Sequence, residues 1–353
     1  MSERIKIAVF GVGRWGVHLL RNFLQHPQAQ VIAVVDPNSD CLTVAAQQFK
    51  LDSRIFLTTQ WQDALDLNGL QAVAIATPAA THYELITAAL KQKLHVLAEK
   101  PLTLSANEAI QLCQLADEQQ RQLVIDHTYL FHPAVLKGRE VVRSSTLGAL
   151  RYGYATRTHL SPVRSDVDAL WDLAIHDIAI LNYWLSETPC TIAANGQVWL
   201  QSDSINPFPN GLADTVWATL TYPSGFRATI HVSWLNSDKQ RRSCIVGEKG
   251  SLIFDELSSE PLVVQSGEFE RHGKLFSPIN QARSVLNLPN NEPLQNLCSH
   301  FLNCVQQNRS SEISSGWLGA ELVQILVALS ESMQQNGRSI TLKAQISESA
   351  IIA

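Results

Sequence analysis

Short apolar runs alternate with amphipathic segments along the first third of the chain. Short apolar runs predict buried strands, and segments with a period near 3.6 residues predict helices. Strands are expected at residues 5–10, 30–35, 54–57, 72–76, 95–98 and 123–125. Helices are expected after residue 16, at 40–48, from 61, from 81 to 92 and from 105 to 120. Repeated strand–helix units of this kind predict a parallel sheet with helices on both faces.

Two of these helices have the sequence of a capping box at their start. Thr81 is followed three residues later by Glu84, and Ser105 is followed by Glu108. In a capping box the hydroxyl accepts a hydrogen bond from the backbone N–H three residues on, which satisfies one of the free donors of the helix. The sequence therefore predicts helix starts capped by Thr81 and Ser105.

The pattern changes after about residue 126. A long helix is expected at 169–185, and strand pairs at 211–222 with 225–234 and at 243–246 with 251–254 are each joined by a short turn with glycine. Strands joined in this way are antiparallel. The polar stretch 261–291 is expected to be an irregular surface excursion, and helices are expected at 294–307 and 317–336. We predict an α/β fold with a parallel-sheet domain over residues 1–125 and a second domain over 126–353.

Composition and charge exclude several classes of protein. The formal charge of the 353 residues is −5 and no block of basic residues exists, so nucleic acid is not an expected partner. No apolar run approaches the roughly 20 residues of a membrane-spanning helix, and the start of the chain does not resemble a signal peptide. The six scattered cysteines show no metal-binding spacing, so we expect a cytoplasmic protein with reduced thiols and no metal site.

A glycine motif follows the first strand. Gly11, Gly13 and Gly16 have the G-x-G-x-x-G spacing that permits a tight turn, close approach of a pyrophosphate and close packing of the next helix. Asp36 ends the second apolar run, where a carboxylate accepts hydrogen bonds from an adenosine ribose and repels a 2′-phosphate. Residues 37–39 offer no arginine for such a phosphate. The motif predicts a Rossmann domain that binds NAD in preference to NADP.

Further candidates for cofactor binding lie in the glycine loop and at the ends of later strands. Ligands of parallel sheets bind beyond the carboxyl ends of the strands. The candidates are Arg14, Trp15, Thr77, Pro78, His82, Glu99, Lys100 and Pro101. For His82, a structural role within the predicted capping box is an equally good interpretation.

The chain resembles the Gfo/Idh/MocA oxidoreductases, the relatives of glucose–fructose oxidoreductase and inositol 2-dehydrogenase. The resemblance is carried by the glycine motif, by Ala76-Thr77-Pro78, by Glu99-Lys100-Pro101 and by Asp172-x-x-x-His176, and it extends to residues 225–234 and 247–250. It implies a Rossmann domain followed by an α/β domain with an open, mainly antiparallel sheet. It also implies NAD(P)-linked oxidation or reduction of a sugar or polyol hydroxyl.

Hydride removal from a secondary alcohol needs a base that takes the hydroxyl proton. Lys100 precedes a proline at a strand end, which fixes its backbone. His176 has a reference pKa near neutrality, and Asp172 lies one helical turn before it on the same face. The predicted catalytic residues are therefore Lys100, His176 and Asp172, with the expectation that Lys100 and His176 meet across one gap. A self-satisfied structural pair is the alternative for Asp172 and His176.

Other residues have less certain roles. Trp171 stands where many relatives carry glycine and is expected to narrow the pocket. Arg157, His159 and Arg164 precede the helix and could reach an anionic substrate group, although solvated side chains are the usual alternative. A packing or hinge role is expected for His127 and His132, where the two domains join.

The predicted function is NAD-dependent hydride transfer to or from a hydroxyl of a sugar, nucleotide sugar or cyclitol. Reduction of an unsaturated substrate, as in biliverdin reductases of this superfamily, is a second possibility, and a non-catalytic NAD-sensing regulator is a third. An open sheet with one uncovered face commonly pairs with a copy of itself, so a homodimer or homotetramer is expected. The sequence does not disclose the substrate.

Overall fold

The computed structural model describes residues 4–203, 205 and 207–342. Contacts between residues divide this part of the chain into two compact units. The first unit holds residues 4–131 together with 291–323, and the second holds 132–290 together with 324–342. The chain thus leaves the first unit after its sixth strand, forms the second unit and returns to add a helix to the first.

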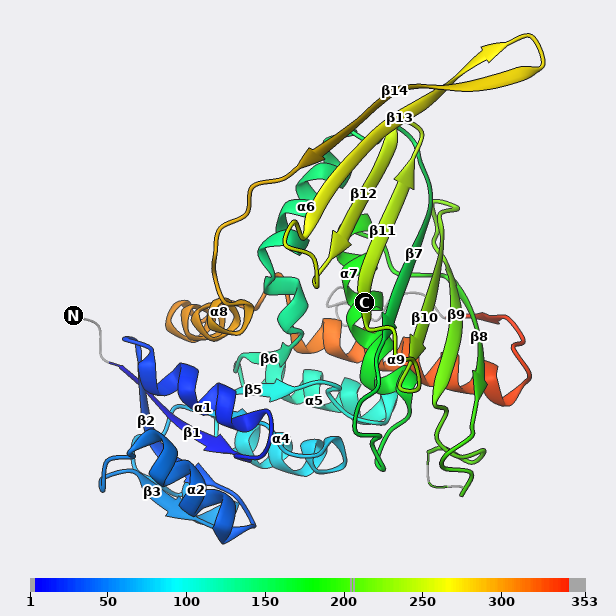
Figure 1. Ribbon diagram of the computed structural model, residues 1–353. Coiled ribbons are helices and arrows are strands. Elements are labelled where there is room, and N and C mark those ends of the chain that lie inside the picture. The colour runs from blue at the N-terminus through cyan, green and yellow to red at the C-terminus, as the bar shows by residue number, and fades with distance from the viewer. Residues whose placement is uncertain (1–3, 204, 206, 343–353) are drawn as a thin grey trace. The chain divides into compact units, whose positions relative to one another are not determined.

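The first unit is built on a parallel sheet, as predicted (Figure 1). Within the described residues its strands lie in the order β3-β2-β1-β4-β5-β6, and each neighbouring pair is parallel. The strands are β1 Ile5–Phe10, β2 Ala29–Val35, β3 Phe56–Thr58, β4 Ala72–Ile75, β5 His95–Glu99 and β6 Leu123–Asp126. The order reverses direction between β1 and β4, which is where such sheets bind dinucleotides.

Helices connect these strands because parallel strands need crossover connections. They are α1 Gly16–Gln25, α2 Ser39–Phe49, α3 Trp61–Leu65, α4 His82–Lys91 and α5 Ala106–Glu118, with short 3₁₀ turns η1 Ala79–Thr81 and η2 Thr128–Phe131. After the second unit, α8 Pro293–Gln307 packs on α1 and η2. Helix α9 Gly316–Gln334 begins in the first unit and continues into the second.

One of the two predicted helix caps is confirmed and the other is wrong. The Ser105 hydroxyl accepts a hydrogen bond from the Glu108 backbone N–H at 3.4 Å and begins α5. Thr81 has helical backbone angles and makes no capping bond. Its hydroxyl instead donates to the Pro78 carbonyl at 2.8 Å, because the 3₁₀ turn η1 already leads the chain into α4. The threonine therefore stabilises the loop after β4 and does not cap the helix.

The second unit is built on a mainly antiparallel sheet, again as predicted (Figure 1). Its order in the described residues is β14-β13-β12-β11-β7-β10-β9-β8-β15, and β7 with β10 is the parallel pair. The strands are β7 Leu150–Thr158, β8 Thr191–Gln197, β9 Thr215–Thr221, β10 Arg227–Ser233, β11 Gln240–Gly247, β12 Gly250–Asp255, β13 Leu262–His272, β14 Leu275–Val285 and β15 Ile340–Thr341.

Two helices of this unit pack closely on each other. They are α6 Pro133–Arg143 and α7 Ile175–Leu185, and a π-helical turn η3 Leu170–Ala174 precedes α7. A side chain at Gly138 of α6 would meet the Trp184 ring of α7 at 2.8 Å, so glycine lets the two helices approach. The buried Trp184 indole donates to the Val135 carbonyl at 2.9 Å.

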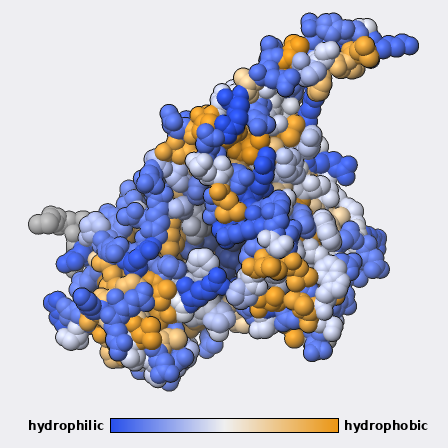
Figure 2. All heavy atoms as spheres, viewed as in Figure 1, coloured by the Kyte–Doolittle hydropathy of each residue, from blue (hydrophilic) through white to orange (hydrophobic). Residues whose placement is uncertain are grey.

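The expectation of an irregular excursion at 261–291 is wrong. Most of this stretch is a long hairpin of β13 and β14, paired from Val263 with Val285 to His272 with Leu275. Only the first residues of β13 are buried, and the outer part of the hairpin is exposed on both faces. A hairpin exposed on both faces has no buried face to impose an apolar alternation, so its polar sequence resembled a loop. Figure 2 shows hydrophobic residues among polar ones on this hairpin, which carries exposed Phe269, Leu275 and Phe276.

Among the residues described here, no helix is both long and apolar enough to cross a bilayer. The same part of the chain contains no cluster of three or more histidine, cysteine or acidic residues able to hold a metal ion. The six cysteines are free thiols.

Candidate active site

The glycine loop of the first unit has the geometry that its sequence predicts. Gly11 has φ +83°, and a Cβ there would lie 2.6 Å from the Ala76 carbonyl oxygen. A Cβ at Gly16 would lie 2.0 Å from the Gly11 carbonyl oxygen. By contrast, a Cβ at Gly13 would meet nothing within 4 Å. Gly11 and Gly16 are thus required by the protein itself, whereas Gly13 borders open space at the start of α1, where a pyrophosphate would fit.

This difference leads to a prediction for two single substitutions. We expect Gly13→Ala to leave the thermal stability of the free protein unchanged and to weaken NADH binding at least about tenfold, because its methyl group would occupy space meant for the pyrophosphate. Gly16→Ala should lower the melting temperature even without cofactor, since its methyl group would strike backbone. Thermal unfolding and NADH fluorescence titration measure both effects. A Gly13→Ala protein that binds NADH normally would contradict the assignment of the loop.

Asp36 closes the same loop at the end of β2. Its Oδ2 accepts a hydrogen bond from the Val12 backbone N–H and its Oδ1 accepts one from the Asn38 N–H, both at 2.9 Å. Each carboxylate oxygen can accept a second bond, so the side chain can still receive a ribose hydroxyl. The residues here fit an adenosine ribose, and they fit NAD better than NADP because no cation accompanies the carboxylate at 37–39.

Arg14 and Trp15 are the exposed side chains of the loop. Trp15 is 60% exposed, and the Arg14 guanidinium lies 6.0 Å from the centre of its ring. A bound dinucleotide could cover this indole, so both residues stay candidates for cofactor contact.

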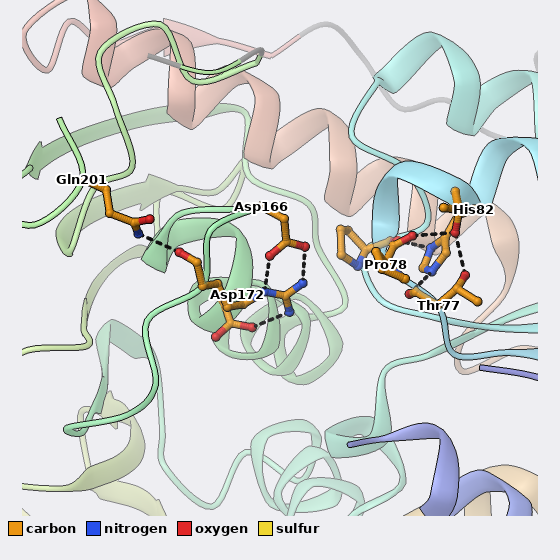
Figure 3. A network of polar contacts seen from close by, with 9 residues as sticks. Thr77, Pro78, His82, Asp166, Asp172 and Gln201 are labelled. Carbon is orange, nitrogen blue, oxygen red and sulfur yellow. Dashed lines mark hydrogen bonds and ion pairs between the residues drawn. The ribbon is translucent and has the colours of Figure 1, made fainter. Parts of the chain in front are cut away.

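His82 lies between two strand-end loops and is completely buried. Its Nε2 is 3.0 Å from the Thr77 carbonyl oxygen and its Nδ1 is 2.9 Å from that of Pro101 (Figure 3). The Thr77 hydroxyl also bonds the Thr81 hydroxyl at 2.7 Å. The histidine therefore holds the loop after β4 to the loop after β5, which favours the structural interpretation of His82 over direct cofactor contact.

A carboxyl pair lies directly beside Lys100. Glu99 and Asp126 are register partners at the ends of β5 and β6, and their side chains hydrogen-bond each other. Asp126 also accepts a bond from the Thr128 hydroxyl. Burial, followed by the charge of Asp126, raises the pKa of Glu99 well above its usual range, and burial raises the pKa of Asp126. Asp126 thus disfavours the ionisation of Glu99, whereas the positive charge of Lys100 favours the ionisation of both carboxyls.

Sequence reasoning missed Asp126. The available signal was its position at the end of the last predicted strand of the sheet, next to the strand that carries Glu99 and Lys100. Recognising the pair needs the register of two strands that are not connected by a short turn.

In the second unit, Asp172 and His176 differ from the residues around them. Within residues 167–182, Asp172 and His176 are partly exposed and all of the remaining residues are buried. Asp172 lies in the π-helical turn η3 and His176 in the first turn of α7, so the prediction of one α-helix over 169–185 is wrong in its first turn. A π turn inserts an extra residue into a helix, and such turns are frequent at functional sites.

An arginine from the preceding loop holds Asp172. Arg164 donates to Asp172 at 3.2 Å and to both oxygens of Asp166, at 2.9 and 2.6 Å (Figure 3). The Gln201 amide donates to the Arg164 carbonyl at 2.7 Å and fixes the loop. Arg164 is about one-third exposed, so an anionic ligand group could replace one of its two carboxylate partners.

Asp168 caps the start of this helical segment. It is 1% exposed and accepts a hydrogen bond from the Trp171 backbone N–H at 3.1 Å. Burial raises the pKa of Asp168 to about 7. Because the pKa of Asp168 is higher in the folded than in the unfolded protein, its contribution to the free energy of unfolding is fully present at low pH. That contribution is lost as the pH rises through about 7.

We therefore predict that Asp168→Asn, which keeps an acceptor oxygen, raises the melting temperature relative to the wild type more at pH 8 than at pH 5. Asp166→Asn is the matched control of opposite sign. The Arg164 hydrogen bond lowers the pKa of Asp166, so that carboxylate stabilises the fold above its unfolded pKa and its removal should cost slightly more at pH 8. Thermal unfolding across the two pH values measures both, and equal behaviour of the two variants would contradict the argument.

Arg157 and His159 have different environments from Arg164. The Arg157 guanidinium is 3% exposed and pairs with the fully buried Asp177 at 2.8 and 3.2 Å, and the Ser243 hydroxyl donates to the same carboxylate at 3.1 Å. Arg157 therefore forms a buried ion pair within the core and does not face an anionic ligand. Burial, then the positive charge of Arg241, lowers the pKa of His159.

Two further expectations are settled by packing. Trp171 does not narrow a pocket, because it is 1% exposed, packs edge-on against Phe208 and donates to the Ser330 hydroxyl at 2.9 Å. The large Trp171 ring thus fills space in the core of the second unit. His132 caps α6, where its Nδ1 accepts a hydrogen bond from the Ala134 N–H at 3.1 Å.

The fold and these residues define a class of protein: a two-unit oxidoreductase with a dinucleotide-binding Rossmann unit and a unit built on an antiparallel sheet. Residues 5–127 match the oxidoreductase family model with an NAD-binding Rossmann fold, and residues 135–253 match the GFO/IDH/MocA C-terminal domain. The chain belongs to the GFO/IDH/MocA oxidoreductase family.

Named relatives agree with this assignment. The chain is 31% identical to UDP-N-acetylglucosamine 3-dehydrogenase of Acidithiobacillus ferrooxidans over 241 residues, which are 67% of this chain and 70% of that protein. It is 23% identical to scyllo-inositol 2-dehydrogenase (NAD(+)) of Bacillus subtilis over 88% and 89% of the two chains. A solved structure of the A. ferrooxidans enzyme superposes with a TM-score of 0.79 at 23% identity, covering 95% of this chain and 99% of that one, which shows the shared fold.

Proposed function

We propose that this protein is an NAD-dependent dehydrogenase that acts on a secondary hydroxyl of a sugar, nucleotide sugar or cyclitol. The observation that carries the proposal is the pair Asp172 and His176, the partly exposed side chains of an otherwise buried segment. Placing two ionisable side chains on a mostly buried segment costs free energy of folding, and such groups are typical of functional sites. The family assignment and the named dehydrogenases among the relatives support the same reaction class.

The proposed roles follow from the chemistry of each group. NAD supplies the hydride acceptor when it is bound, held by the glycine loop and Asp36. His176 takes the proton of the substrate hydroxyl, since an imidazole is a competent base near neutral pH. Asp172, held by Arg164 at 3.2 Å, binds a substrate hydroxyl or orients the imidazole. Lys100 stabilises the substrate oxygen as its negative charge develops.

The test is a panel of inositols, free sugars and nucleotide sugars, including UDP-N-acetylglucosamine, assayed by NADH absorbance. We expect at least one compound to be oxidised with NAD. If the protein binds NADH tightly and turns over none of the panel, the proposal of a non-catalytic NAD sensor replaces that of a dehydrogenase.

We also infer a homodimer or homotetramer formed through the second sheet. Helices cover one face of that sheet, and α6 packs on β12. The face away from them carries Trp217, which is 49% exposed and stacks on His231 at 5.1 Å with nearly parallel rings. Large exposed aromatic side chains on a sheet are typical of interfaces. Sedimentation should give a dimer or tetramer, and Trp217→Arg should dissociate it; a monomeric wild type would overturn the inference.

A further inference from the structure

His127 is a buried residue whose ring nitrogens make no hydrogen bond to the described residues. It follows β6 directly and is 1% exposed. Its backbone is well held, because its N–H donates to the Ile125 carbonyl and its carbonyl accepts from Leu130, both at 2.8 Å. A buried histidine with both nitrogens unsatisfied is rare, and its usual explanation is a ligand or an ordered water.

The charge state of the ring fits hydrogen bonding and not proton transfer. Burial, followed by the positive charge of Lys100, lowers the pKa of His127 to about 3. At neutral pH the imidazole is therefore uncharged, with one N–H donor and one acceptor nitrogen. One ring nitrogen can therefore bond a primary carboxamide, either by donating to its oxygen or by accepting from its N–H₂ group.

The position of His127 in the sheet says which part of a dinucleotide it would meet. The strand order is β3-β2-β1-β4-β5-β6, and the dinucleotide of such a sheet crosses the carboxyl edge between β1 and β4. Asp36 at the end of β2 fits the adenosine half. The other half then lies toward β4, β5 and β6, where Lys100 and His127 follow their strands.

We propose that His127 is a cofactor-positioning residue that hydrogen-bonds the nicotinamide carboxamide of bound NAD(H). The proposal rests on the proposed use of NAD. It assigns an unsatisfied buried group to the carboxamide, which carries a donor and an acceptor and belongs to the half of the cofactor expected toward β6. Its effect would be to fix which face of the nicotinamide ring points toward the substrate.

The experiment compares two ligands and two variants. His127→Phe keeps a planar ring and removes both nitrogens. We expect it to weaken NADH binding about 3- to 10-fold, the range for one neutral hydrogen bond. Binding of ADP-ribose, which lacks nicotinamide, should be unchanged. The melting temperature of the free protein should be unchanged or higher, because an unsatisfied polar group is replaced by an apolar one. His127→Asn, which retains a donor and an acceptor, should recover part of the NADH affinity.

His95→Phe is the matched control in the same unit. His95 is the first residue of β5, so it lies at the amino ends of the strands, away from the carboxyl ends where His127 lies. Its Nδ1 accepts a hydrogen bond from the Gln122 N–H at 3.0 Å. This variant should lower the melting temperature and leave the ratio of the NADH and ADP-ribose affinities unchanged. The proposal is overturned if His127→Phe leaves that ratio unchanged, or if it weakens the binding of both ligands equally. Neither readout needs a substrate, so failure of the substrate panel is a separate result.

Discussion

Lys100→Met should lower kcat by about 10²- to 10⁴-fold, the range for loss of a positioned proton-transfer or charge-stabilising group. Methionine is an unbranched side chain only one atom shorter than lysine, and it carries no charge. Lys100 directly follows β5, beside the Glu99–Asp126 pair, with which its charge interacts. Since the proposed cofactor contacts of the glycine loop and Asp36 lie at the ends of other strands, NADH affinity should change much less than kcat. Stopped-flow turnover and NADH titration on one preparation separate the two effects.

Two comparisons make this prediction specific. Lys91 is an exposed lysine at the end of α4 in the same unit, and Lys91→Met should leave both kcat and NADH affinity unchanged. Removing the Lys100 charge also leaves the carboxyl pair without its neighbouring cation, so the melting temperature must be measured as well. A Lys100→Met protein that is folded, binds NADH and turns over normally would rule out a catalytic role for Lys100.

The carboxyl-end positions of the first sheet were predictable because each predicted strand carried its own apolar run and its own terminating motif. Gly11, Asp36, Thr77 and Lys100 each follow a buried strand in the sequence, and parallel topology then brings such ends to one edge. The predicted strand boundaries differ from the observed ones by at most two residues. Local sequence is sufficient here because strand, turn and helix signals alternate without interruption.

The second unit was less predictable because its elements depend on distant partners. Strand β7 pairs with β10 and β11, and the paired residues lie 75 to 97 residues apart in the chain. Neither β7 nor α6 was predicted from the sequence. The hairpin of β13 and β14 was missed because most of it buries neither face. The periodicity of apolar residues reflects which face of an element is buried. An element without a consistently buried face therefore has no clear periodicity in the sequence.

The same limit explains which site residues were misjudged. Trp171 was expected at a pocket because many relatives carry glycine in this stretch, whereas its environment is set by Phe208 and Ser330. Arg157 was a candidate for anion binding, yet its partner Asp177 lies 20 residues away and on a different element. A charged residue in a sequence carries no record of whether it is paired.

Asp177→Asn should destabilise the protein by about 3–5 kcal/mol, although Asp177 takes no part in the proposed reaction. Asp177 is 0% and Arg157 3% exposed, and the carboxylate accepts from the Arg157 guanidinium at 2.8 Å and from the Ser243 hydroxyl at 3.1 Å. The amide cannot balance the guanidinium charge, which would be left buried and uncompensated. Because the pair joins α7 to strand β7, the cost appears as a lower midpoint in urea unfolding.

The double variant Arg157→Met with Asp177→Leu tests the cause of that loss. Replacing both charges by apolar side chains of similar size removes the uncompensated charge and often restores stability. We therefore expect the double variant to be clearly more stable than Asp177→Asn alone. Arg241 and Glu256 form a partly exposed pair at 3.1 Å in the same unit, and Glu256→Gln should cost no more than about 1 kcal/mol. If Asp177→Asn costs no more than Glu256→Gln, desolvation of the Arg157 charge is not what makes Asp177 necessary.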